Sequence, residues 1–526
     1  MTIKKLIIVL VTIISLFPVI LALVSSVNQP QVQSNLQLYQ TNLILQASEL
    51  SDSNDSEAVD LAPVKIALLG TNPYLTAKNQ YQEVKKLTQE NLDTLSTKLT
   101  KIPESNLNID NNNVLTKSRL NSAKNFDQKE IKKQITQDER FLHKIDLSLG
   151  IIEAKQNNIE QSLQLWNGII KSSDEQSIKT ATVLTGLWNQ PPEAITNTEQ
   201  ILNSQLKGWF RNEALKQYYQ VTEQKQALIS LQKQENEIAT QAITKLTLVG
   251  GIPLISGLLG VGILVLLIIQ LFLKGKSAIL ANNNELAWET PWNGEVIWLV
   301  LIVGFFFIGQ IILPLFFGII GSIFKLSVAT LTLRYKAIYV LVSYLTMAIT
   351  GLLVMYFSIK PFFPLPKDWF KFNWLSNWIL WGIGGYFVAF PLVVIVSLIN
   401  QQIWQGKGGS NPLLLLALES QDKIALSIFF ITASLAAPLF EEIIFRGFLL
   451  PSLTRYFSVW GAIIVSSLIF ALAHLNLSEV LPLATLGIVL GFVYTRSKNL
   501  LSSMLLHSLW NSGTLISLFI LGSGNQ

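Results

Sequence analysis

The sequence contains no cysteine and only three histidines. The absence of cysteine excludes disulfide bonds, thiol nucleophiles and cysteine-ligated metal sites. Charged residues are also scarce, at 14% of the 526 positions, whereas an ordinary soluble chain carries about 25%. No basic segment alternates with aromatic residues, so nothing indicates a nucleic-acid partner. These shortages exclude a disordered chain and a typical cytosolic enzyme.

Hydrophobic residues are abundant instead, at 50% of the chain, and the mean hydropathy is +0.41. Residues 28–245 are polar and rich in Gln, Asn, Lys and Glu, whereas residues 246–526 are apolar. The apolar half holds 14 Lys and Arg against 9 Asp and Glu. Such an excess of basic residues is typical of the cytoplasmic loops of membrane proteins. We therefore predict a protein embedded in a lipid bilayer, with one extramembrane portion.

The chain begins with a basic pair followed by a long apolar run. Lys4 and Lys5 precede the run from Leu6 to Val24. A basic start and about 19 apolar residues fit either a membrane anchor or a long signal peptide. The run is longer than the usual signal core of about 7–15 residues, which favours the anchor. Residues 1–27 are therefore predicted to be an N-terminal membrane anchor.

The polar portion predicts an extramembrane α-helical domain. Apolar residues recur at spacings of three and four over 142–152 and 159–170, with a turn at 156–158 between them. This helix–turn–helix is similar to a tetratricopeptide unit, although such arrays normally need about three copies and fewer are present. The sequence therefore favours an unclassified helical domain over a tetratricopeptide array. The segment 103–128 lacks apolar periodicity and predicts a linker.

Eight further apolar segments follow the polar portion. Most approach the ~20 residues that a helix needs to cross a hydrocarbon layer of ~30 Å. No alternating strand pattern occurs, and helices satisfy their own backbone groups in lipid, so all eight are predicted to be helices. The segments are 246–273, 296–323, 337–359, 376–399, 424–446, 458–474, 480–495 and 499–521. With the anchor they give about nine spans and an all-α, polytopic helical membrane bundle.

We divide the apolar half into membrane helices over 246–400, a loop over 401–423 and a membrane core over 424–526.

The distribution of basic residues predicts the orientation of this bundle. When residues 4 and 5 are placed inside, most basic loops fall on the same side, and only the loop with Lys325, Arg334 and Lys336 disagrees. The N-terminus is therefore predicted to be cytoplasmic, and residues 28–245 to be extracytoplasmic.

Ionisable side chains inside a membrane cost about 2.5–3.5 kcal/mol each on insertion scales, so a cluster of them indicates function. Two adjacent carboxylates, Glu441 and Glu442, lie at the end of the segment 424–446. Glu442 and Arg446 are four residues apart and share a helix face, so they can pair. Glu441 points about 100° away and lacks a helical partner. Partial desolvation would then suit Glu441 to act as a general base.

Two of the three histidines also fall in apolar segments. His474 ends its segment, four residues after Phe470. His507 lies in the last segment, four residues before Asn511, and these two side chains share a helix face. His143 lies among charged residues and is interpreted as a surface residue. Each feature alone has a structural explanation, such as an interfacial ion pair or a hydrogen-bonded packing residue.

In combination, these features resemble a known family. The three motifs are, in chain order, Glu441-Glu442-x-x-x-Arg446, Phe470-x-x-x-His474 and His507-x-x-x-Asn511. Their order on three neighbouring segments resembles the CAAX protease and bacteriocin-processing (CPBP) family of intramembrane endopeptidases, which includes the type II CAAX prenyl endopeptidases. The resemblance covers about residues 424–521, a fifth of the chain.

The resemblance implies cleavage of a membrane-associated peptide or protein, which could be prenylated or carry a leader. The implied roles are activation of a water by Glu441 and His474, stabilisation of the oxyanion by His507 and Asn511, and support of the site by Glu442 with Arg446. Two mechanisms stay open. Glu441, His474 and His507 match the ligand types of a catalytic Zn²⁺ site, as a metalloprotease requires. A metal-free mechanism based on glutamate and water is the alternative, and no other cofactor is indicated.

Two other classes of function are compatible with the same segments. One is a non-catalytic membrane scaffold or bacteriocin-immunity-type protein, which would tolerate Glu441→Gln. The other is a transporter with Glu441 in a proton relay, although no internal repeat relates the membrane segments. The peptidase prediction also carries a geometric conflict. With the segment boundaries above, His474 lies towards the opposite side of the membrane from Glu441 and His507.

Overall fold

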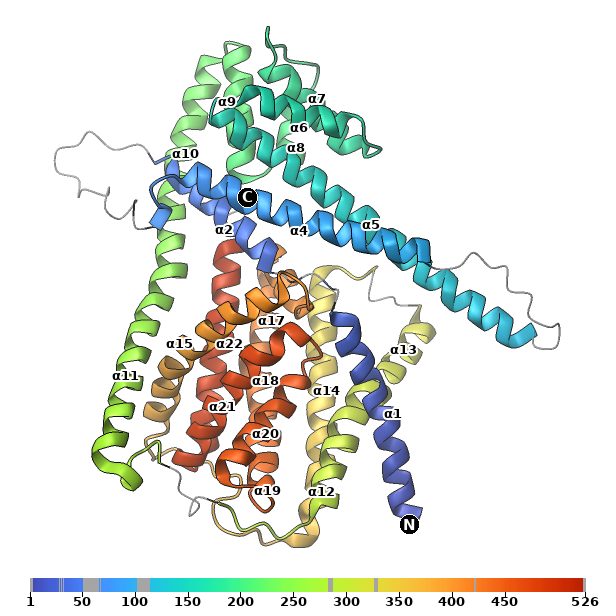
Figure 1. The fold of residues 1–526 in the computed structure, drawn as a ribbon, viewed down its shortest axis with the longest axis vertical. Coiled ribbons are helices and arrows are strands. Elements are labelled where there is room, and N and C mark those ends of the chain that lie inside the picture. Colours follow the sequence, from blue (N-terminus) through green and yellow to red (C-terminus); the bar gives the residue numbers. More distant parts are fainter. Residues whose placement is uncertain are drawn as a thin grey trace. The chain divides into compact units, whose positions relative to one another are not determined.

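The computed structural model describes residues 3–27, 29, 31, 33–50, 66, 68–101, 114–281, 287–325, 330–420 and 422–523. Every regular element within these ranges is a helix (Figure 1), which confirms the all-α class. The chain folds into two compact units. We call Ser34–Thr247 the polar unit, and Met1–Gln33 together with Leu248–Ser523 the membrane unit.

The polar unit is a bundle of helices around one hydrophobic core. Its helices are α2 (Gln33–Ser48), α4 (Pro73–Lys101), α5 (Val114–Lys155), α6 (Ile159–Ile170), α7 (Glu175–Trp188), α8 (Thr198–Gln205), α9 (Gly208–Val221) and α10 (Lys225–Leu246). Trp166 and Trp209 are fully buried in this core. The Trp166 indole lies directly against Gly150, where a Cβ atom would come within 2.2 Å of it. Small and large residues on α5 and α6 therefore interlock.

The predicted hairpin at residues 156–158 is present between α5 and α6, but nothing supports a tetratricopeptide fold. Helix α5 has 42 residues, which exceeds a whole tetratricopeptide repeat of about 34 residues. The predicted linker 103–128 is partly wrong, because α5 begins at Val114. The remainder of that segment, up to residue 113, lies outside the described residues.

A largely buried group of charges joins α5, α9, α10 and the residue that follows α2 in the polar unit. Lys216 on α9 forms ion pairs with Glu49 just after α2, with Glu213 on α9 and with Glu235 on α10, at N–O distances of 2.9, 3.1 and 3.0 Å. Lys155 on α5 also pairs with Glu213, at 3.0 Å. Burial alone would raise the pKa of Glu49, but Lys155 and Lys216 lower it to about 2. The network therefore holds ionised groups inside the unit, where each depends on its partners.

We expect Lys216→Met to destabilise the polar unit by about 3 kcal/mol, because Glu235 would lose its lysine partner and Glu49 and Glu213 would share Lys155. Hydrogen–deuterium exchange of the full-length protein in detergent, at fixed pH, should show faster exchange in α2, α9 and α10. Lys179→Met is the control, since Lys179 forms an exposed pair with Glu175 on α7. Equal exchange in both variants would contradict a stabilising role for the network.

The membrane unit consists of long apolar helices and short connecting ones. In chain order they are α1 (Ile3–Ser26), α11 (Ile252–Lys274), α12 (Gly294–Leu299), α13 (Leu313–Phe324), α14 (Leu333–Ile359), α15 (Trp378–Trp404), α16 (Pro412–Glu419), α17 (Lys423–Ile431), α18 (Ala437–Glu441), α19 (Leu450–Leu453), α20 (Val459–Leu472), α21 (Val480–Ser497) and α22 (Leu500–Gly522). The segment 401–423, predicted as a loop, therefore contains α16. π-Helical segments join α12 to α13, α17 to α18 and α18 to α19.

Eight helices of the described chain are long and apolar enough to cross a membrane. They include Leu6–Ser26 and the uninterrupted helix Lys225–Ser277. The one predicted segment that is not among these eight helices is 458–474, which forms α20 and has only 14 residues. At 1.5 Å per residue α20 is about 21 Å long, too short to cross a hydrocarbon layer of about 30 Å. The chain is therefore a multi-pass membrane protein, and its described residues give eight candidate spans, not nine.

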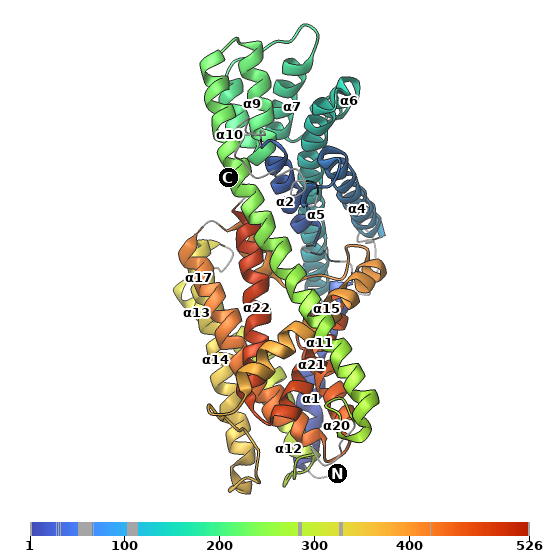
Figure 2. The same ribbon diagram turned by 90° about the vertical axis from the view of Figure 1, so that its left-hand side faces the viewer.

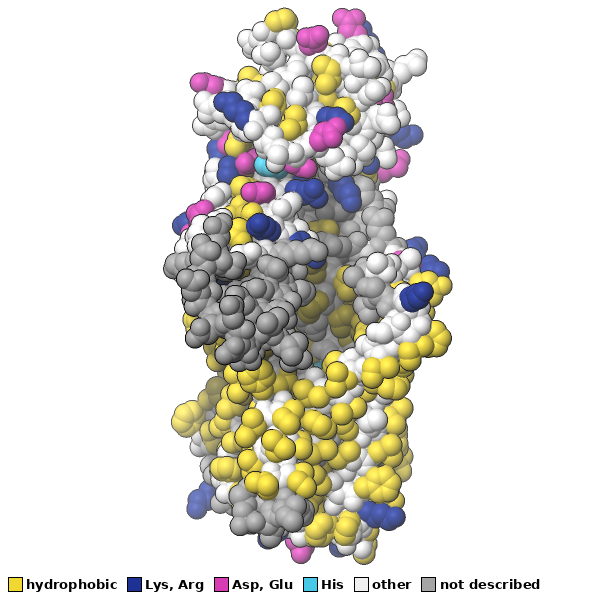
Figure 3. All heavy atoms as spheres, turned by 90° about the vertical axis from the view of Figure 1, so that its right-hand side faces the viewer, with side chains coloured by type: hydrophobic (Ala, Val, Ile, Leu, Met, Phe, Trp, Pro, Cys, Tyr) yellow, Lys and Arg dark blue, Asp and Glu magenta, His cyan; other side chains and the backbone are white. Residues whose placement is uncertain are grey.

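The outer surface of the membrane unit is hydrophobic. Phe17, Leu266 and Ile323 are more than half exposed, and they belong to helices on different sides of the unit. The lower part of Figure 3 shows the hydrophobic side chains as a nearly continuous covering, with charged residues gathered at its end. A surface of this kind is unfavourable in water and favourable against lipid tails.

Helices α21 and α22 run through the middle of the membrane unit, between α11 and α14 (Figures 1 and 2). Helix α20 packs against α21, and α15 packs against both α21 and α22. The core around them includes the fully buried aromatic residues Phe445, Phe448, Phe470 and Tyr494. Of the motif residues, Glu442, Arg446, Phe470 and His507 are buried in this unit, whereas Glu441, His474 and Asn511 are half-buried.

Candidate active site

The helix that carries the two adjacent glutamates is longer than predicted. It extends from Lys423 to Leu453 rather than from 424 to 446. Glu441 ends α18 and Glu442 begins the π-helical segment η8 (Glu442–Leu449). The carboxylates therefore lie near the middle of the helix, not at its end, so the predicted placement was wrong. π-Helical turns are rare and occur frequently at functional sites.

Glu442 and Arg446 form the predicted ion pair inside the protein. Arg446 Nη1 donates to Glu442 Oε1 at 2.7 Å, and the two side chains are 1% and 0% exposed. The guanidinium also lies 4.4 Å from the centre of the Phe470 ring, and its Nη2 donates to the carbonyl oxygen of Gly487 at 3.4 Å. Because a buried ion without its partner is strongly unfavourable, each charge requires the other.

Glu442 also holds His507, a contact that the sequence did not predict. Glu442 Oε1 lies 2.9 Å from Nδ1 of the buried imidazole of His507 on α22. An ionised carboxylate only accepts hydrogen bonds, so Nδ1 carries the proton of this contact. In the neutral imidazole Nε2 is then an acceptor, and in the imidazolium it is a donor. Glu442 thereby fixes the direction and the tautomer of His507.

Glu441 lies on the other side of His507. Its Oε2 is 3.9 Å from His507 Nε2. That separation is too long for a direct hydrogen bond, but two ordinary hydrogen bonds to one shared water can bridge it. The Glu441 side chain is 14% exposed, in contrast to the fully buried Glu442. Neighbouring glutamates thus occupy different environments, as the sequence predicted.

The second oxygen of Glu441 accepts a hydrogen bond that the sequence analysis missed. Tyr344 on α14 donates its hydroxyl to Glu441 Oε1 at 3.0 Å. Tyr344 is 97 positions away in the sequence, and several other tyrosines occur in the same helix. No local pattern distinguishes Tyr344 from them, so only the packing of the helices could reveal it.

His474 joins this group through an aromatic ring. Its Nδ1 lies 2.9 Å from the carbonyl oxygen of Phe470, one turn earlier. The Phe470 ring is 4.9 Å from the His474 ring and 5.7 Å from the His507 ring, edge-on to both. The short α20 brings its end to the depth of His507, which removes the conflict produced by the predicted boundaries. The two histidines therefore flank one phenylalanine.

Asn511 lies on α22, one turn beyond His507, and is bound to the backbone of the glutamate-bearing helix. Its Nδ2 donates to the carbonyl oxygen of Ala433 at 2.7 Å, and Ser508 donates to that of Ser434 at 2.5 Å. Both carbonyls belong to the π-helical segment η7 (Thr432–Ala436), in which the α-helical hydrogen-bond ladder is altered. One of the two amide protons of Asn511 is used in this contact.

The residues predicted as zinc ligands do not form a ligand group in the described ranges. No three His, Cys, Asp or Glu side chains within them are arranged to hold a metal ion. His507 Nδ1 is engaged by Glu442, and His474 Nδ1 by the Phe470 carbonyl. The zinc site stays a prediction, and the mechanism below uses only the protein's own groups.

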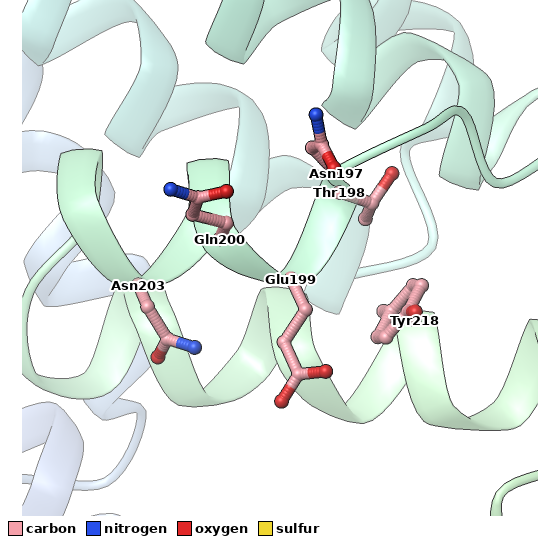
Figure 4. Close-up of a pocket in the computed structure, with 6 residues that line it drawn as sticks. All are labelled: Asn197, Thr198, Glu199, Gln200, Asn203 and Tyr218. Atoms are coloured by element: carbon pink, nitrogen blue, oxygen red, sulfur yellow. The ribbon is translucent and has the colours of Figure 1, made fainter.

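A separate hollow of about 420 Å³ lies in the polar unit. Its lining residues are Asn197, Thr198, Glu199, Gln200, Asn203 and Tyr218. Figure 4 shows that these side chains, from the start of α8 and from α9, point in different directions rather than at one centre. Most of them are exposed and polar. The hollow therefore lacks the convergent groups that a catalytic site requires.

Comparison with known proteins agrees with the motifs. The profile of the Rce1-like type II CAAX prenyl endopeptidases matches residues 423–513. Three bacterial proteins are similar to 26% of the chain. The Bacillus subtilis protein YdiL, named as a candidate membrane peptidase, is 28% identical over 139 residues, and the membrane-embedded CAAX protease MroQ of Staphylococcus aureus is 30% identical over 144. No solved structure matches the chain.

The coverage of these relatives differs. The matched region spans 55% of YdiL and 57% of MroQ, about half of each protein. It spans 77% of the UPF0177 protein YxdF of Lactococcus lactis, at 30% identity over 147 residues. The family profile concerns the C-terminal membrane helices, and the polar unit lies outside its residues 423–513.

We expect Arg446→Met to lower the stability of the membrane unit by about 3–5 kcal/mol, because Glu442 would remain buried without its partner. Thermal unfolding of the protein in detergent measures the loss. The double variant Glu442→Gln/Arg446→Met removes both charges and should recover much of it. Arg334→Met, at a half-exposed pair with Asp422, should change little. Equal losses in the single and double variants would contradict the pairing.

Proposed function

The chain belongs to the Rce1-like family of type II CAAX prenyl endopeptidases, and on this basis we propose that it is an intramembrane endopeptidase. The observation that carries the proposal is the meeting of Glu441 and His507, from two helices, at 3.9 Å. A partly exposed carboxylate and a fixed imidazole at this separation can hold one water between them. The reaction is hydrolysis of a peptide bond in a membrane-associated polypeptide.

In the proposed mechanism Glu441 is the general base. Its Oε2 takes a proton from the water as the water oxygen attacks the carbonyl carbon of the substrate. A carbon–oxygen bond forms, and the carbonyl oxygen becomes an oxyanion. The carbon–nitrogen bond then breaks, and Glu441 returns its proton to the leaving amine. The carboxylate thus acts first as base and then as acid, and it is regenerated.

His507 is proposed to act on the charge that develops during this step. Its Nδ1 proton is held by Glu442, and a protonated Nε2 would donate a hydrogen bond to the oxyanion. A prepositioned donor of this kind contributes most in a site shielded from water. The second amide proton of Asn511 and Nε2 of His474 are the further groups proposed to contact the water or the oxyanion. Arg446 acts through Glu442.

The polar unit and the orientation of the chain belong to the proposal as well. The N-terminus is proposed to be cytoplasmic and the polar unit extracytoplasmic, which the basic loops favour. The polar unit could then collect or orient a substrate at the membrane surface. The substrate class is a peptide segment tethered to the membrane by a lipid, such as a prenyl group, or by a hydrophobic leader.

We expect Glu441→Gln and His474→Ala each to abolish cleavage without lowering the amount of protein in the membrane. Neither change removes a buried ion pair, so folding should persist. Comparison of membrane proteomes from cells with the wild type and with Glu441→Gln should reveal accumulated precursors and identify the cleaved bond.

The matched control is Glu289→Gln, an exposed glutamate in the membrane unit, which should leave processing unchanged. Full processing by Glu441→Gln would refute the catalytic assignment and favour a scaffold. Dependence of solute uptake on Glu441 in sealed vesicles would favour a transporter instead.

Because the chain contains no cysteine, single cysteines can test the orientation without a background signal. We expect Ser204→Cys in the polar unit to react with a membrane-impermeant maleimide in intact cells. Lys276→Cys, at the end of α11, should react only after the cells are opened. Both positions are exposed. The reverse pattern of labelling would overturn the proposed orientation.

A further inference from the structure

Tyr344 is the polar side chain nearest to the proposed base that lies outside the three motifs. It belongs to α14 (Leu333–Ile359), whereas the family profile matches only residues 423–513. Helix α14 packs against η7 and α18, the segments that lead to Glu441. The Tyr344 ring meets the Phe440 ring edge-on at 6.1 Å. The hydroxyl is therefore held by the packing of two helices.

The two oxygens of the Glu441 carboxylate face different partners. Oε1 accepts from the Tyr344 hydroxyl at 3.0 Å, and Oε2 faces His507 Nε2 at 3.9 Å. Rotation of the carboxylate would exchange these oxygens or move both from their partners. The bond to Tyr344 therefore keeps Oε2 directed at the place where a shared water would bind.

We propose that Tyr344 is a positioning residue for the general base Glu441, and that it keeps this carboxylate directed at the water. This inference rests on the proposed function. Tyr344 acts from a helix outside the family profile, so this chain would use a third helical partner to prepare its base. A merely structural tyrosine would affect folding without lowering kcat in the folded protein.

The test compares the wild type with Tyr344→Phe, as purified full-length proteins in detergent. The substrate is a synthetic peptide spanning the cleavage site of the precursor that accumulates with Glu441→Gln. At fixed pH kcat should fall about tenfold, because Oε2 of Glu441 is no longer directed at the water. KM should change much less than kcat, because Tyr344 is not proposed to contact the substrate.

A matched variant and an isosteric one separate positioning from packing. Tyr356→Phe, at an exposed tyrosine on the same helix, should keep the wild-type kcat. Replacement of Tyr344 by 3-fluorotyrosine keeps the ring and the donating hydroxyl, so kcat should also match the wild type. All kcat values are expressed per folded molecule, measured by thermal unfolding, so the comparison holds even if Tyr344→Phe folds poorly.

The outcomes distinguish this inference from the function beneath it. If the wild type cleaves the peptide while Tyr344→Phe keeps the wild-type kcat, the positioning role is overturned and the peptidase function stands. If the wild type cleaves no peptide, the proposed function fails and the inference fails with it. A lower kcat in Tyr344→Phe, with an unchanged kcat in the 3-fluorotyrosine variant and in Tyr356→Phe, supports the inference.

Discussion

The buried ion pair between Glu442 and Arg446 is the interaction on which the candidate site depends. Both charges are almost completely removed from solvent, so neither can be accommodated without the other. Through Glu442 the pair fixes Nδ1 of His507, and Arg446 also contacts the Phe470 ring that His474 and His507 flank. One charged contact therefore arranges residues from three helices.

Irregular helices provide the geometry that this arrangement requires. Two π-helical segments surround Glu441 in the long helix, and α22 satisfies two carbonyls of the first one through Ser508 and Asn511. Helix α20 ends after 14 residues, and His474 follows it, half-buried, with its ring 4.9 Å from the Phe470 ring. Regular helices of full length would have separated these side chains by most of the membrane thickness.

Much of this could be predicted from the sequence because the signals are local. Long apolar runs identify spans, and the spacing of Glu442 and Arg446 predicts a pair on one helix face. The contact between Glu442 and His507 could not be predicted this way, since it depends on how two distant helices pack. The same holds for Tyr344.

The error at the end of the 424–446 segment arose because Arg446 was interpreted as interfacial, whereas Glu442 neutralises it in the interior. The tetratricopeptide interpretation failed because a local hairpin does not reveal that α5 continues for 42 residues.

The central claim is that Glu441 and His507 hold one water in a common site. A high-resolution experimental structure of the full chain in a lipid environment tests this most directly. The account predicts an ordered water within hydrogen-bond distance of both Glu441 Oε2 and His507 Nε2, with Tyr344 bound to Oε1. A structure in which Glu441 points into lipid would contradict this claim. So would a structure in which Glu441 and His507 are too far apart for a single water to bridge them.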